Sequence, residues 1–186
     1  MSDEIKITAP LDDKTVASLK AGDRVSISGT LYTARDTAHK RLVETMDKGE
    51  PLPFDLKGQV IYYVGPSPAK PGAIIGSAGP TTSYRMDPYA PRLLEKGAKG
   101  MIGKGKRDQS VIDAMKKYKA VYFAAIGGAA ALIAKSIKAV EIVAYEEFGP
   151  EAIRKLEVED FKAVVINDIN GNDLYDIGKQ KYKVSE

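Results

Sequence analysis

Short apolar runs that alternate with segments of helical periodicity are the feature of this sequence that most constrains its fold. The runs are rich in the β-branched and aromatic residues that are typical of buried strands. We expect strands at residues 59–64, 73–77, 101–103, 120–126, 140–145 and 161–166. Strands that recur in turn with helices predict a layered α/β domain.

The N-terminal part of the chain alternates polar and apolar residues at 4–8 and again at 24–33, which predicts two half-buried strands. Helices are expected after a cap at Asp36 or Thr37, at 89–97, after a cap at Asp108, at 129–137 and at 150–156. The segment 129–137 is apolar on most sides, so we expect an internal helix there. The polar tail from Asn167 should be irregular.

Length and composition predict an ordinary globular protein. A chain of 186 residues with 44% hydrophobic and 28% charged residues suits a single domain that spans residues 1–186. The net charge of +3 is too balanced to indicate a nucleic-acid partner. Basic residues gather at 96–119 and acidic residues at 141–160, which predicts a polarised surface suited to a subunit interface or an anionic substrate.

The absence of cysteine excludes disulfides, thiolate metal sites and an iron–sulfur cluster held by this chain alone. With His39 as the one histidine, a zinc site built from this chain is not expected either. The N-terminus lacks a basic segment followed by an apolar core, and no apolar run approaches the roughly 18 residues that a membrane span needs. We therefore expect a cytoplasmic protein without a membrane segment.

Residues 79–91 carry the densest group of chemically useful side chains. A glycine–proline turn opens this stretch and should leave the hydroxyls of Thr81 and Thr82 pointing out of a loop. Arg85 follows closely enough to share a small anion with Thr81, and arginine suits two-point recognition of a carboxylate. The alternative is a polar loop that begins a helix, with Arg85 and Asp87 paired on the surface. Local chemistry does not decide between the two.

Two further loops carry cations where strands are expected to end. Arg35 lies at a strand-to-helix junction, beside helix N–H groups that attract anions, and Lys104 follows another strand. If these loops meet that of Thr81 and Arg85, three cations and a hydroxyl would suit a small dicarboxylate. The alternatives are a surface role for Arg35 and a surface or capping role for His39. No residue of the chain is an evident strong base.

Residues 100–107 match the spacing of a phosphate-binding loop up to its last position. That position needs serine or threonine to hold magnesium, and this chain has Arg107 instead. The substitution argues against nucleotide hydrolysis.

Three stretches carry a resemblance to a known family: ARDTAHKR at 34–41, GPTTSYRMD at 79–87 and IGKGKR at 102–107. In this order they resemble the β subunit of class I fumarases and of the related L-tartrate dehydratases, over about residues 10–175. In other members this unit is the C-terminal domain of one polypeptide. The resemblance implies a swivelling β/β/α domain with a mixed sheet and flanking helices. It also implies the reversible hydration of fumarate to L-malate.

The resemblance implies a role for each matching residue. Arg35, Arg85 and Lys104 would bind the substrate carboxylates and stabilise an intermediate of aci-carboxylate character. Thr81 would lie next to the reacting carbon as a candidate for proton transfer, which makes Thr81 and Arg85 the expected catalytic residues. The residues expected to orient these loops from behind are Asp36, His39, Thr82 and Asp87.

The resemblance further implies an α subunit that carries a 4Fe-4S cluster on its own cysteines and supplies the rest of the active site. Ala34 and Tyr84 stand where many relatives have glycine and a small residue, and Tyr84 could narrow the pocket. Fumarate, tartrate and a methyl-substituted fumarate all stay open as substrates. The alternative from another class is a non-catalytic anion-binding module of the same fold, which would be expected to lose some of its charged residues.

Overall fold

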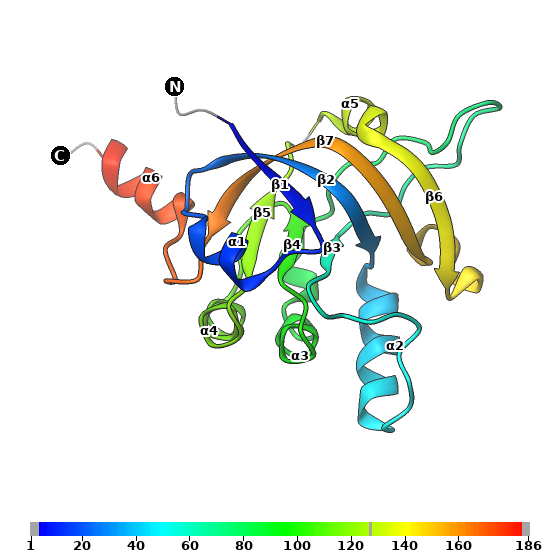
Figure 1. Ribbon diagram of the computed structural model, residues 1–186, viewed down its shortest axis with the longest axis horizontal. Coiled ribbons are helices and arrows are strands. Elements are labelled where there is room, and N and C mark those ends of the chain that lie inside the picture. The colour runs from blue at the N-terminus through cyan, green and yellow to red at the C-terminus, as the bar shows by residue number, and fades with distance from the viewer. Residues whose placement is uncertain (1–3, 127, 184–186) are drawn as a thin grey trace.

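The computed structural model describes residues 4–126 and 128–183, which form a mixed sheet of seven strands with helices packed against it (Figure 1). The strands are β1 (Ile5–Ala9), β2 (Arg24–Thr33), β3 (Val60–Tyr62), β4 (Gly100–Gly103), β5 (Val121–Ala124), β6 (Ile137–Ala144) and β7 (Ile153–Asn167). The helices are α1 (Asp13–Ser18), α2 (Asp36–Asp47), α3 (Ala90–Glu95), α4 (Gln109–Tyr118), α5 (Ala130–Ser136) and α6 (Leu174–Tyr182), with 3₁₀ helices η1 (Ser83–Met86) and η2 (Glu146–Glu151). The expected α/β class is confirmed.

Strand β2 organises the sheet because it has neighbours along both of its edges. It pairs in parallel with β1 and, at its end, with β3 on one side, and antiparallel with β7 on the other. Strands β3, β4 and β5 continue the parallel part, and β5 then meets the far end of β7. The pairings β2–β3–β4–β5–β7 thus form a closed circuit, and the sheet folds back on itself.

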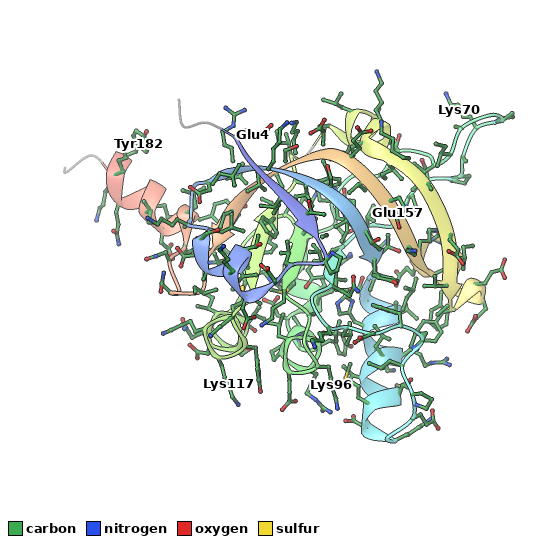
Figure 2. All side chains as sticks on the ribbon, in the orientation of Figure 1. Glu4, Lys70, Lys96, Lys117, Glu157 and Tyr182 are labelled. Atoms are coloured by element: carbon green, nitrogen blue, oxygen red, sulfur yellow. The ribbon has the colours of Figure 1, made fainter. Side chains whose placement is uncertain are left out.

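Alternate residues of the central strands face two separate cores. Val60 and Phe123 belong to the core enclosed by the folded sheet, whereas Ile61 and Tyr122 belong to the core between the sheet and helices α2, α3 and α4. Figure 1 shows these three helices together on one side of the sheet. Lys96 and Lys117 of the basic stretch lie on the outer side of these helices (Figure 2). None of the helices in the two described ranges is long and apolar enough to cross a bilayer.

One expected helix is a strand. Residues 150–156 were predicted to be helical from Pro150, but Pro150 lies in η2 and β7 begins at Ile153. The side chains of Ile153, Leu156 and Val158 are buried because β7 pairs with β2, for example Leu31 with Leu156. A long-range partner therefore overrides the local helix signal.

Three other expectations differ from the structure. The predicted strand at 73–77 is a loop, and the tail forms α6, whose Asp173 side chain accepts a hydrogen bond from the Tyr175 N–H at 2.8 Å. The helix at 129–137 exists as α5 but is not internal: Leu132 is 67% exposed. The alanines of α5 make the segment apolar on most sides, but alanine is also favourable at exposed helix positions, so it does not indicate burial.

The parallel pair β1–β2 approaches too closely at one point for any side chain. Gly29 has φ +102°, and a Cβ there would lie 2.2 Å from the backbone oxygen of Ala9. The β2–β7 register also shifts between Ile27 and Gly29, which is typical of a β-bulge.

We predict that Gly29→Ala lowers the free energy of unfolding by on the order of 3 kcal/mol, because it adds both backbone strain and a clash with fixed backbone. Gly49→Ala is the matched control, since Gly49 has φ +69° but open space around it, and it should cost about 1 kcal/mol. Urea titration of the two variants measures the difference. Equal losses would contradict the proposed clash at Gly29.

His39 lies inside the molecule, so the expectation of a surface or capping histidine is wrong. His39 lies on the buried face of α2, where its side chain is fully buried and the ring packs edge-on against Tyr63 with centroids 5.3 Å apart. Nδ1 lies 2.8 Å from the backbone oxygen of Arg35 and donates to it, which leaves Nε2 as the unprotonated nitrogen. Burial lowers the pKa of His39 to about 4, and the nearby Arg107 acts in the same direction.

The buried His39 should make stability depend on pH. Between pH 4 and 6.5 the unfolded chain binds a proton at His39 and the native chain does not, so stability rises with pH across this window and is lost on acidification. The shift corresponds to about 3 kcal/mol. We predict that His39→Gln flattens the difference in unfolding free energy between pH 4 and pH 7, measured by urea titration. An unchanged slope would show that His39 titrates normally.

Candidate functional site

The three loops singled out in the sequence lie at the carboxyl ends of neighbouring parallel strands. Arg35 follows β2, the Thr81 loop returns to the end of β3, and Lys104 follows β4. The Thr81 N–H donates to the backbone oxygen of Tyr63 at 2.7 Å, which fixes the start of its loop. The carboxyl ends of parallel strands share one edge of a sheet, where ligands of open α/β sheets bind.

Arg35 and Arg85 meet at one carboxylate. The Asp36 side chain lies 3.3 Å from the Arg85 guanidinium and 3.8 Å from that of Arg35. These side chains are about a quarter to two fifths exposed, so each ion pair contributes little to stability. Asp36 holds the two arginines near each other without burying them, and an incoming anion can therefore compete for both.

Glu151 occupies the N-terminus of α2, a contact that the sequence analysis missed. Its carboxylate accepts a hydrogen bond from the Thr37 N–H at 2.9 Å and lies 3.4 Å from the Arg35 guanidinium. Arg35 itself is the N-cap residue and makes no side-chain cap bond, so the expected cap at Asp36 or Thr37 is wrong. The anion at this helix terminus is the chain's own glutamate.

A glycine makes room for the Arg35 side chain. A Cβ at Gly65 would lie 2.6 Å from the Arg35 Nη1 atom, so the guanidinium rests against bare backbone at the end of β3. The Arg35 Nε atom is buried and has no hydrogen-bond partner among the described residues. Arg35 thus keeps an unused donor on the inner side of the site.

The threonine loop and the lysine loop lie side by side. Thr82 and Lys104 form an isolated parallel bridge, in which the Ser83 N–H donates to the Lys104 backbone oxygen at 2.9 Å. The Lys104 N–H in turn donates to the Ser83 hydroxyl at 3.1 Å. The side chains of Thr81 and Thr82 are half-buried, whereas those of Lys104 and Arg85 are exposed. The structure thus brings the cations and hydroxyls to one edge.

Asp87 does not pair with Arg85, so the alternative of a surface Arg85–Asp87 pair is wrong. Asp87 is buried and accepts a hydrogen bond from Arg107 Nε at 2.7 Å, while Arg85 pairs with Asp36. Burial raises the pKa of Asp87, and the Arg107 guanidinium opposes that effect. Asp87 and His39 lie behind the loops, whereas Asp36 and Thr82 lie at their surface.

The charged loops form an open surface. A cavity of about 540 Å³ lies elsewhere, between α5 and β7, where Ile133 and Glu159 are among its lining residues. Tyr84, next to Arg85, is 64% exposed.

Comparison with known proteins gives a consistent assignment. Residues 1–178 match the family model described as "Fumarase C-terminus". The chain is 43% identical over 176 residues to Fumarate hydratase 2 of Leishmania major, covering 92% of this chain and 31% of that protein. It is 48% identical over 154 residues to the aerobic class I fumarate hydratase of Escherichia coli K12, covering 82% of this chain and 28% of that protein. The chain therefore spans about a third of these relatives.

A relative of similar length comes from Methanocaldococcus jannaschii. It is provisionally named as the β subunit of an L(+)-tartrate dehydratase, and it is 38% identical over 180 residues, covering 93% of this chain and 92% of that protein. The resemblance that the three sequence stretches carry is confirmed by these matches. Since the family model covers nearly the whole sequence, this chain belongs to the fumarase C-terminus family, whose relatives named here are hydro-lyases.

Proposed function

We propose that this chain is the β subunit of a two-chain hydro-lyase that reversibly hydrates fumarate to L-malate. The observation that carries the proposal is the meeting of Arg35 and Arg85 at Asp36, on the sheet edge that also bears Thr81 and Lys104. Guanidinium groups suit the planar, two-oxygen shape of a carboxylate. The fumarate hydratases among the relatives support the choice of substrate.

The reaction adds hydroxide to one alkene carbon of fumarate and a proton to the other. As the hydroxide adds, negative charge develops on the carboxylate next to the second carbon. Arg35, Arg85 and Lys104 are the groups of this chain that would hold the two carboxylates and stabilise that charge. The Thr81 hydroxyl is the candidate for delivering the proton to carbon, in concert with an acid of the partner chain.

The side chains of this chain do not fit an iron–sulfur cluster. The sequence has no cysteine, and no group of acidic and histidine side chains in the described ranges could hold a metal ion. The proposal therefore places the 4Fe-4S cluster on the α chain, and the roles assigned here to Arg35, Thr81, Arg85 and Lys104 do not depend on a step at the cluster.

Two observations support a partner chain. The fumarate hydratases that match are about three times as long as the aligned region, and the M. jannaschii relative is named as a subunit. Apolar side chains are also exposed at α5 and just before it: Ile126 and Leu132 are 63% and 67% exposed and line the cavity between α5 and β7. A partner chain that packed against this face would bury them.

L-tartrate is the second candidate substrate, because the M. jannaschii relative carries that name and tartrate is also a four-carbon dicarboxylate. A methyl-substituted fumarate would use the same cations. A non-catalytic anion-binding module of this fold is the candidate from a different class.

The decisive experiment is anaerobic co-expression with a candidate α chain from the same genome, followed by assays on fumarate and L-tartrate. We expect hydration of fumarate by the pair, no activity of either chain alone, and loss of activity in oxygen. Dehydration of tartrate alone would keep the hydro-lyase and change the substrate. A stable pair that is inactive on each dicarboxylate would favour the binding module.

Site variants of the active pair test the assigned roles. We predict that Thr81→Ala and Arg85→Ala each lower kcat/KM by about 10²–10⁴-fold, because each removes a group that acts on the reacting centre. Arg92→Ala is the matched control for Arg85→Ala: Arg92 is 41% exposed and Arg85 38%, and Arg92 pairs with Asp47 at 2.9 Å on the helical side. Steady-state kinetics should show the control at the wild-type rate. Full activity of Thr81→Ala and Arg85→Ala would refute the site.

A further inference from the structure

Arg107 is a buried cation that the proposed reaction does not use. Its side chain is fully buried, and it follows Lys104 by three residues, at the position where a phosphate-binding loop would need serine or threonine. Its Nε donates to one oxygen of Asp87 at 2.7 Å, while the Asp108 N–H donates to the other oxygen at 2.8 Å. One carboxylate on the arginine loop, two residues after Arg85, is thus tied twice to the lysine loop.

The Arg107 guanidinium lies between two aromatic rings. Its Cζ atom is 5.3 Å from the ring centre of Tyr63 and 5.0 Å from that of Tyr122. Nη1 lies 3.2 Å from the Met101 sulfur. Tyr63 follows β3, Met101 is in β4 and Tyr122 in β5, so three neighbouring strands fix the plane of the guanidinium. Lysine could not reproduce this fit, because it lacks a planar, forked head group.

Hydrogen bonds connect Tyr122, which packs against Arg107, to the backbone around Lys104. The Tyr122 hydroxyl donates to the backbone oxygen of Gly105 at 2.9 Å and is 2.8 Å from the Ser83 hydroxyl, which accepts from the Lys104 N–H. A Cβ at Gly103 would lie only 2.0 Å from the Ser83 hydroxyl oxygen, so β4 and the serine are in direct contact. The backbone on each side of Lys104 is therefore attached to the core that holds Arg107.

Stability alone does not account for a charge in this place. A buried ion pair loses the hydration of both ions, and apolar residues of similar volume often stabilise a core as well or better. The Asp87–Arg107 pair instead holds the Lys104 loop and the Arg85 loop at a fixed distance from each other. Two cations that grip one small dicarboxylate need such a fixed spacing.

We propose that Arg107, through Asp87, is a positioning residue that sets Lys104 and Arg85 at the spacing needed to bind one dicarboxylate and stabilise its transition state. The inference rests on the proposed function of the loops. Arg107 itself is buried and touches no substrate; it acts through Asp87 and the backbone of the lysine loop.

The test uses the complete two-chain enzyme with three variants: Arg107→Met, the double variant Asp87→Asn/Arg107→Met, and Asp168→Asn. Asp168 is the matched control because it is also a buried carboxylate, accepting from the N–H groups of Ala21, Asn170 and Asn172, but it lies beyond the carboxyl end of antiparallel β7, at the opposite edge of the sheet. Activity is expressed per folded complex, well below each melting temperature.

We expect Arg107→Met to lower kcat by about 100-fold per folded complex, as a misplacement of about 1 Å can do. The double variant leaves no unpaired buried charge, so its melting temperature should recover while kcat stays low. Asp168→Asn should lose stability and keep kcat. Recovery of kcat together with stability in the double variant would overturn the proposal, because the pair would then be a structural element only.

A second readout does not depend on activity. Hydrogen exchange of this chain reports the Ser83 and Lys104 amides, which bond across the two loops. These amides should exchange faster in Arg107→Met than in wild type and stay protected in Asp168→Asn. Unchanged protection in Arg107→Met would overturn the proposed positioning even if the pair proved inactive. An inactive wild-type pair with the expected exchange pattern would instead count against the proposed function alone.

Discussion

The antiparallel pairing of β2 with β7 is the contact on which the rest of the structure depends. It closes the sheet, and its register fixes what lies beyond the ends of both strands. Tyr32 faces Lys155, so the chain after β2 runs alongside the chain before β7, and Glu151 reaches the first turn of α2. The environment of Arg35 is thus set by a strand that is far from it in the sequence.

The electrostatics of the site follow from this arrangement. Without a ligand, the two arginines are held by carboxylates of the chain itself, Arg35 by Glu151 and Asp36, and Arg85 by Asp36. Each pair is partly exposed, so breaking it costs little free energy, and contacts of the guanidinium with a ligand carboxylate can offset that loss. The site is ordered in advance without being blocked.

Part of this structure follows from the sequence. Alternation predicts β2, short apolar runs predict β3, β4 and β5, and the Asp108 cap predicts α4, because these elements follow local rules. The strand-end positions of Arg35 and Lys104 could be predicted for the same reason. The helix expected at 150–156 could not be corrected from the sequence, since pairing with β2 and β6 makes that segment a strand.

The parts of the site that sequence reasoning missed all depend on distant contacts. Glu151 is 114 residues from Thr37, and nothing in its neighbourhood marks it as a helix cap. Ser83 lies within the stretch 79–87, but its contact with Lys104 depends on the parallel alignment of β3 and β4. Arg107 was noticed only as a departure from another motif, and its burial with Asp87 gives that departure a physical reason.

The shared carboxylate of Asp36 has a consequence for how this surface can change over evolutionary time. Because Arg35 and Arg85 both pair with the same Asp36 oxygen, Oδ2, a substitution at Asp36 alters both arginines at once. A substitution at either arginine leaves the Asp36 carboxylate to the other. Effects of mutations at these positions should be non-additive, as is usual for groups in one ion-pair network. Arg35, Asp36 and Arg85 are therefore expected to change together during evolution. A shift in substrate preference would more easily begin at the exposed Tyr84 than at either arginine.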